Sequence, residues 1–160
     1  NAQVPFESRP GEQAAVVVNV GGKLTAPQNY LIAPAQPGIY TDSLGPAILD
    51  DQFRRVTGLN PARVGRVIQM FVGGLGDTVP PVESGGALNA GSDAAVPVTV
   101  EIGGLNAPVK YNGLAPGYVG LYQVNVTVPN VPTGPSVPLI LRQTGVPANP
   151  SQTITIPVGP

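Results

Sequence analysis

The chain of 160 residues contains no cysteine, no histidine and no tryptophan, and only 11% of its residues are charged. Without cysteine there is no disulfide bond, no catalytic thiolate and no thiolate ligand for zinc. Without histidine there is no imidazole acid or base, and Ser84 and Ser92 have no partner for a Ser-His-Asp triad. The most common catalytic and metal-binding arrangements are therefore excluded, and we expect neither an enzyme nor a bound cofactor.

The chain also lacks a strong net charge and any long apolar run. Its formal charge is −1, whereas a nucleic-acid-binding protein needs a basic stripe. The only gathering of basic residues is Arg54, Arg55, Arg63 and Arg66, interrupted by Asp50 and Asp51. No apolar run approaches the roughly 20 residues of a membrane helix, and no signal peptide is visible. We therefore expect no nucleic-acid partner, no membrane insertion and a solvated arginine cluster, and we take residue 1 as a processing or cloning boundary.

What the chain does contain is 41 glycines and prolines (21 and 20) together with 42% hydrophobic residues. Residues 122–128 alternate, with Tyr122, Val124, Val126 and Val128 on one face and polar residues between them. This period of two is typical of a half-buried strand, which Pro129 ends because proline cannot donate to the ladder. Similar patterns predict strands at residues 1–6, 15–20, 29–33, 47–49, 66–72, 96–102, 107–111, 137–142 and 153–158. No segment has a sustained helical period, so we predict an all-β fold.

An internal repeat divides the chain. The residues NAQVP at 1–5 match NVTVP at 125–129, and the predicted strands that follow them also correspond (15–20 with 137–142, and 29–33 with 153–158). We therefore predict a partial β-module of three strands at residues 1–41, followed by a complete immunoglobulin-like β-sandwich at residues 42–160. The partial module lacks the opening strands that the complete one contains.

Three segments carry a family resemblance: NAQVPFE near the start, PARVGRVIQMFVGGLG in the middle, and GLAPGYVGLYQVNVTVP after residue 112. Together they resemble the Solibacter uncharacterised C-terminal domain, which is found at the ends of large secreted acidobacterial proteins. The resemblance covers nearly the whole chain and implies an immunoglobulin-type β-sandwich in an extracellular setting. It supplies no catalytic residues. Members of that family usually have further sequence upstream of the segment that resembles NAQVPFE, and this chain does not.

The incomplete module predicts self-association. Three strands cannot cover their inner face, and their edges leave backbone groups unpaired. We expect the apolar residues of the partial module, Val4, Val16, Val18, Val20, Tyr30 and Ile32, to meet a second copy of the chain. The contact would form either by strand addition or by sheet packing, and a head-to-tail contact would build a filament. The predicted function is a non-enzymatic structural or assembly module, located outside the cell or at the cell surface.

The alternative function is a carbohydrate-binding or adhesion module. Tyr111, Tyr118 and Tyr122 lie near Pro116 and could form an aromatic patch for a sugar, although tyrosines at the edge of a sandwich are more often structural.

Four weaker candidates remain. Asp50 and Asp51 could begin a calcium loop, but no dense acidic pattern follows them. A glycosidase pair could be drawn from Asp77, Glu83, Asp93 and Glu101, as it could from the acids of any sandwich. Lys110 could form a cross-link to an asparagine with the help of Glu101, but an exposed lysine is the ordinary case. Asn125 begins a glycosylation sequon, yet its counterpart Asn1 in the repeat favours a hydrogen-bonding role within the strand.

Overall fold

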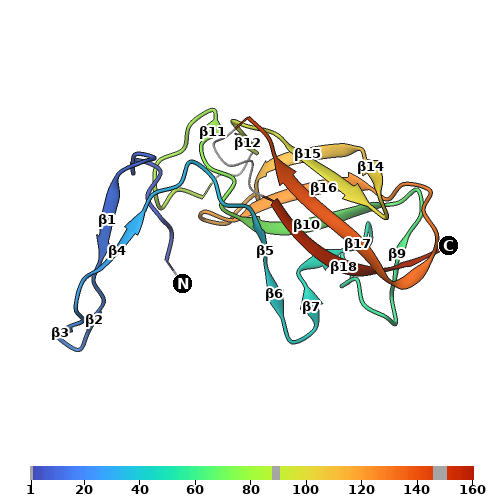
Figure 1. Ribbon diagram of the computed structural model, residues 1–160, viewed down its shortest axis with the longest axis horizontal. Helices are drawn as coiled ribbons and strands as arrows, with labels where there is room; N and C mark the ends of the chain where they lie inside the picture. Colours follow the sequence, from blue (N-terminus) through green and yellow to red (C-terminus); the bar gives the residue numbers. More distant parts are fainter. Residues whose placement is uncertain (1, 88–90, 146–150) are drawn as a thin grey trace.

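The computed structural model describes residues 2–87, 91–145 and 151–160, and within them every regular element is a β-strand, as predicted. Two main sheets form the body of the molecule and enclose one apolar core, which gives a β-sandwich-like architecture. A slender hairpin near the N-terminus, which we call the arm (residues 13–31), projects from one end of the body (Figure 1).

The first main sheet has seven strands in the order β11-β12-β15-β16-β10-β5, with β8 also paired to β10. Its strands are β5 (Gly38–Ile39), β8 (Ile48–Leu49), β10 (Val67–Gly73), β11 (Thr78–Val79), β12 (Asp93–Ala94), β15 (Val109–Leu114) and β16 (Tyr122–Thr127). The long pair at its centre is antiparallel, with Val67 opposite Thr127 and Val72 opposite Tyr122.

The second main sheet has five strands in the order β14-β13-β17-β18-β9. They are β9 (Ala62–Arg63), β13 (Val98–Ile102), β14 (Leu105–Ala107), β17 (Gly134–Gln143) and β18 (Ser151–Gly159). Strand β9 runs parallel to β18, and the other pairs are antiparallel. The predicted hairpin turn at Gly103 and Gly104 joins β13 to β14, and both glycines have positive φ angles (57° and 81°).

The alternating residues form the core between the two sheets. Ile68, Met70 and Val72 of β10 are fully buried, as are Val124 and Val126 of β16. From the second sheet, the inward residues of β13, β17 and β18 join the same cluster: Val98, Val100, Ile102, Val137, Leu139, Leu141, Ile156 and Val158. The period-two prediction is therefore confirmed for these strands.

The prediction of a single strand at residues 107–111 is wrong. Strand β14 ends at Ala107 and pairs with β13 in the second sheet, whereas β15 begins at Val109 and pairs with β16 in the first sheet. Pro108 separates them and cannot donate to either ladder. The chain therefore changes sheets at the proline.

The arm is one long hairpin in two parts. At its base, β1 (Gln13–Val16) pairs with β4 (Gln28–Leu31), and at its tip β2 (Asn19–Val20) pairs with β3 (Lys23–Leu24) across Gly21 and Gly22. The ladder is interrupted between the two parts, where Pro27 has no N–H to donate. Thr25 bridges the gap, because its amide donates to the Val18 carbonyl and its hydroxyl accepts from the Val18 amide (3.0 and 3.1 Å). The predicted strand at 15–20 is thus two shorter strands.

Two anchors hold the base of the arm on the body. After the arm, Ala35 is buried and the Gln36 amide donates to the Gly74 carbonyl (2.7 Å). Before the arm, the Phe6 amide donates to Ser84 Oγ (2.7 Å), and Phe6 packs against the core cluster. Residues 2–6 contain no strand, contrary to prediction, since these contacts go to the loop around Ser84.

The body begins before residue 42. Strand β5 joins β10 through Ile39, which is buried, and the Tyr40 amide donates to the Phe71 carbonyl (3.0 Å). A small hairpin of β6 (Thr41–Asp42) and β7 (Gly45–Pro46) follows directly.

The arm and the β17–β18 hairpin are both antiparallel hairpins. In the arm, Ala14 lies opposite Tyr30, sixteen positions apart (30 − 14), and Ile32 follows two residues later. In the body, Val137 lies opposite Ile156, nineteen positions apart (156 − 137), and Val158 follows two residues later. Each hairpin therefore places alternate apolar residues on one face.

Candidate functional site: an exposed apolar arm

The arm exposes an unusual amount of apolar side chain for its size. Of the 17 large hydrophobic residues that are exposed in the described parts of the chain, seven lie within residues 13–31. They are Val16, Val17, Val18, Val20, Leu24, Tyr30 and Leu31. Concentrations of exposed apolar surface of this kind mark interaction sites more often than ordinary surface.

Five of the six residues predicted to mediate self-association lie on or beside the arm, where four are strongly exposed. Val16 and Val18 are about half exposed (49% and 50%), Tyr30 is 58% exposed and Val20 is 69% exposed. Ile32 is half-buried at the base, where its amide donates to the Glu12 carbonyl (2.9 Å). The sixth residue, Val4, is 64% exposed but lies in the segment that packs near Ser84 rather than in the arm.

We define the arm face as Ala14, Val16, Val18, Val20, Tyr30 and Ile32. In the β17–β18 hairpin the alternating apolar face covers the core, and Val137, Leu139, Leu141, Ile156 and Val158 are all buried. An alternating apolar face is therefore covered in the β17–β18 hairpin, whereas Val16, Val18, Val20 and Tyr30 of the arm face are exposed.

The three tyrosines of the proposed sugar site do not share an exposed patch. Tyr122 is only 3% exposed and its hydroxyl donates to the Gly76 carbonyl, so burial raises its pKa well above the ordinary value. Tyr111 is half-buried and donates to the Leu114 carbonyl (2.6 Å), and burial raises its pKa too. Tyr118 alone is exposed, at 60%. Tyr111 and Tyr122 therefore have structural roles, since both are hydrogen-bonded to backbone carbonyls.

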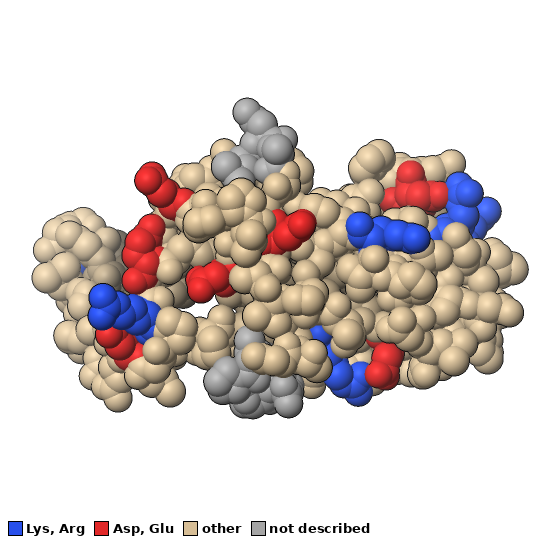
Figure 2. Space-filling model, turned by 90° about the horizontal axis from the view of Figure 1, so that it is seen from above, with Lys and Arg blue, Asp and Glu red and all other residues tan. Residues whose placement is uncertain are grey.

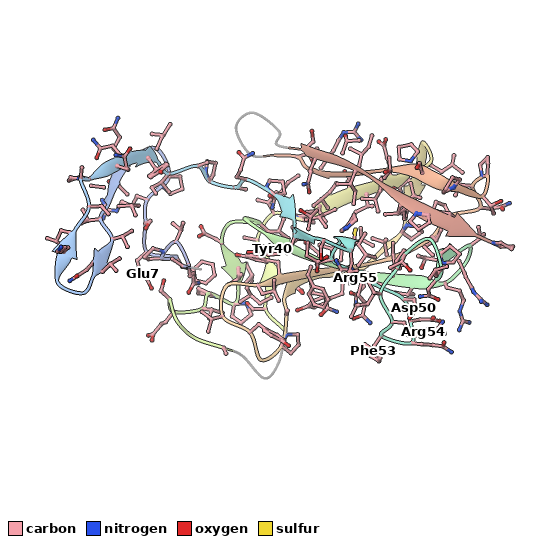
Figure 3. All side chains as sticks on the ribbon, turned by 90° about the horizontal axis from the view of Figure 1, so that it is seen from below. Glu7, Tyr40, Asp50, Phe53, Arg54 and Arg55 are labelled. Carbon is pink, nitrogen blue, oxygen red and sulfur yellow. The ribbon has the colours of Figure 1, made fainter. Side chains whose placement is uncertain are left out.

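Asp50 organises the loop that was considered for calcium (Figure 3). Its Oδ1 accepts from the amides of Gln52 and Arg54 (both 2.9 Å), and its Oδ2 accepts from Arg54 Nε and Nη2 (3.0 and 2.8 Å) and from Asn60 Nδ2 (3.0 Å). Burial acts to raise the pKa of Asp50, but the hydrogen bonds from Asn60, Arg54 and Gln52 outweigh it and hold the pKa well below the usual range. Both carboxylate oxygens are thus already occupied by protein donors.

The neighbouring arginines are likewise paired with acids. Arg66 Nη2 lies 2.6 Å from Asp51 Oδ2, and Arg55 Nη2 lies 2.8 Å from Asp42 Oδ1. A hollow beside them is lined by Asp50, Asp51, Gln52, Arg54, Pro61, Arg63, Val64, Arg66, Val67, Ile68 and Pro160. The acids offset most of the positive charge there, so the hollow has little attraction for an anion.

Two of the remaining polar candidates, Glu101 and Asn125, have structural partners. Glu101 Oε1 lies 2.6 Å from Arg142 Nη1, so it pairs with this arginine, and Lys110 is exposed on β15. Asn125 is half-buried in β16 and accepts a hydrogen bond from Gln123 Nε2 (2.9 Å). Across residues 2–87, 91–145 and 151–160, no three acidic residues gather closely enough to hold a metal ion.

Figure 2 shows a face that is mostly uncharged, with small, separate groups of basic and acidic residues. In the described part of the chain there is also no helix of the length and apolarity needed to cross a membrane.

One feature of the site was not foreseen in the sequence: the network that fixes the start of the arm. Ser84 Oγ donates to Glu7 Oε2 (2.5 Å), and this bond is the main reason that the pKa of Glu7 lies below its ordinary value. The Gly85 amide also donates to Gln3 Oε1 (2.9 Å). Isolated polar residues in two loops give no sequence signal of such contacts over long separations.

Comparison with known proteins provides no identification. No family model matches the chain. No curated protein and no solved structure matches it either.

Proposed function

We propose that this protein is a non-enzymatic structural module that self-associates through its arm face. The observation behind the proposal is that Val16, Val18, Val20 and Tyr30 of the arm face are exposed, whereas the alternating apolar residues of the β17–β18 hairpin are buried. Removing apolar side chains from water contributes about 25 cal/mol for each Å² buried. A second copy that covered the arm face would therefore be stabilised by the same contacts that stabilise the body.

The anchors at the base of the arm support this role. The Gln36 contact to Gly74 and the Phe6 contact to Ser84 hold both ends of the hairpin to the body. A surface held in a fixed direction loses less conformational entropy on binding than a free tail does. The arm is therefore suited to present its apolar face to a partner.

The proposal includes an immunoglobulin-like topology for the body. The strand order β5-β10-β16-β15 corresponds to the A-B-E-D sheet of that fold, and β13-β17-β18 corresponds to the C-F-G sheet. The arm would then be the F–G hairpin of a partial copy, equivalent to β17–β18. This reading agrees with the repeated NAQVP and NVTVP segments and with the resemblance to the Solibacter domain, which favours a location outside the cell or at its surface.

The carbohydrate-binding alternative has less support. A sugar site built on aromatic stacking needs open ring faces, and only Tyr118 of the three tyrosines is exposed. The hydroxyls of the other two are engaged by backbone carbonyls.

The test is the mass of the protein in solution from micromolar to submillimolar concentration, measured by sedimentation velocity. We expect wild-type mass to rise with concentration and Val18→Asp to remain monomeric, because association would bury its charge in an apolar contact. Val119→Asp is the matched control, since Val119 lies on the body with a similar exposure (46% against 50%). A wild type that stays monomeric throughout, or equal association by both variants, would refute the proposal.

A further inference from the structure

Resting on the self-association proposed above, we infer that the arm face of one copy packs against the arm face of a second copy, related by a twofold axis. The product would be a closed dimer in which two hairpins form a small sandwich between two bodies. This differs from a head-to-tail contact, which would propagate into a filament.

The inner side of the first main sheet is not available to the arm of a second copy. In the β17–β18 hairpin the alternating apolar face covers the inner side of the first main sheet, where Ile68, Met70, Val124 and Val126 are fully buried. A second copy has this surface already covered by its own β17 and β18. Among the described residues, the arm carries the largest group of exposed apolar side chains, so the arm face of the second copy is its proposed partner.

The size of the arm face indicates a weak dimer. The arm extends about eight residues from Glu12 to Val20, roughly 25 Å at ~3.3 Å per residue, and it is two strands wide, about 10 Å. Such a face lies below the roughly 800 Å² per partner of a standard interface. We therefore expect association in the micromolar range rather than the nanomolar range.

Charge determines how the two arms are oriented. The segment just before the base of the arm has Glu7, Arg9 and Glu12, with a net charge of −1, and the tip of the arm has Lys23, with a charge of +1. Arg9 lies 3.8 Å from Glu12 and partly offsets it. With the twofold axis across the middle of the arm, the tip of each copy lies beside the base of the other. The antiparallel arrangement brings opposite charges together, whereas a parallel arrangement would place like charges side by side.

The axis would pass near Val16 and its cross-strand partner Gln28, halfway between base and tip. A residue that lies on a twofold axis contacts the same residue of the other copy. Because the chain has no cysteine, a single introduced cysteine reports this contact without interference. We therefore expect Val16→Cys to form a disulfide-linked dimer under mild oxidation. Leu59→Cys is the control, since Leu59 is fully exposed on a loop of the body (101%) and lies off the arm.

Charge reversal provides a second test that does not depend on cross-linking. Lys23→Glu should weaken the dimer roughly tenfold, since two tip-to-base pairs change from attraction to repulsion. Adding Glu12→Lys to Lys23→Glu should restore wild-type affinity, because the opposite signs meet again. All three proteins are compared by sedimentation velocity at low ionic strength.

The outcomes separate this inference from the proposed function. Efficient cross-linking of Val16→Cys together with rescue by the double charge reversal supports the twofold arm pair. Association without cross-linking at Val16, or masses that continue beyond a dimer, would leave self-association intact and overturn the arm-to-arm arrangement. A wild type that never associates would overturn both.

Discussion

Replacing Asp50 with asparagine tests whether its hydrogen bonds hold the loop that connects β8 to β9. Asparagine keeps one oxygen, which can still accept from the amides of Gln52 and Arg54. Its new Nδ2 group would face three donor atoms that Oδ2 now accepts from, two on Arg54 and one on Asn60. Asp50→Asn therefore places a donor against donors and removes a buried charge-assisted network.

The magnitude follows from how exposed each partner is. The Asn60 bond lies in a half-buried region, where a hydrogen bond to a charged group contributes about 1.5–3 kcal/mol. The Arg54 side chain is 55% exposed, so water can replace its contact with Asp50. The ion pair therefore contributes about 0.2–1 kcal/mol to the free energy of unfolding. We expect a loss of about 2–3 kcal/mol in the free energy of unfolding, or roughly 5–10 °C in Tm for a domain of this size. Asp51→Asn, which disturbs only the Arg66 pair, should cost less than about 1 kcal/mol.

The effect of Asp50 should also depend on pH. The folded state holds the pKa of Asp50 below its ordinary value, so the unfolded state takes up a proton first as the pH falls. The stability that Asp50 contributes is fully present above the ordinary carboxyl pKa of about 4 and declines as the pH falls below it. The difference between wild type and Asp50→Asn should therefore narrow in acid, as measured by chemical denaturation. A difference that is independent of pH, or an Asp50→Asn no less stable than Asp51→Asn, would refute the reasoning.

Three further predictions concern the base of the arm, the core and metal ions. Gly74→Ala should loosen the arm and make it more sensitive to limited proteolysis, because a Cβ there would lie 2.1 Å from the Gln36 carbonyl oxygen at a φ of +73°. Gly104→Ala, also at positive φ but with nothing within 4 Å, is its control. Tyr122→Phe should lower the free energy of unfolding by about 1–2 kcal/mol in denaturant titrations, since the Gly76 carbonyl loses its buried donor; an unchanged stability would mean that this bond contributes nothing. A chelator should leave Tm unchanged in thermal unfolding, because the described residues hold no acidic cluster; a clear fall would revive a calcium site.

The alternation of apolar residues predicted the long central strands because burial on one face of a strand imposes a period of two. Val67–Gly73 and Tyr122–Thr127 follow this rule closely. The rule does not report which sheet a strand joins, so the change of sheet at Pro108 was missed. A proline inside a predicted strand was the available signal.

The candidate site was harder to predict for a related reason. Alternating valines look the same whether their face is covered or open, so Val16 and Val18 could not be told apart from the buried residues of β17 by sequence alone. The proposed repeat is the sequence feature that singled out these residues, because it predicts a hairpin without its usual partner sheet. For Asp50, an arginine four residues later was a clearer signal than the adjacent Asp51, since the arginine occupies the oxygens that calcium would need.

The short, interrupted ladder of the arm should make its amides exchange hydrogen with solvent much faster than the amides of the body. The base of the arm has four paired positions and the tip has two, separated by the break at Pro27. Short hairpins of this kind are marginally stable, so their amides should exchange through local opening. Amides at the centre of β10 and β16 should exchange only when the whole body unfolds. A thermal midpoint would then describe the body alone, whereas slow exchange in the arm would be a direct signature that a partner covers it.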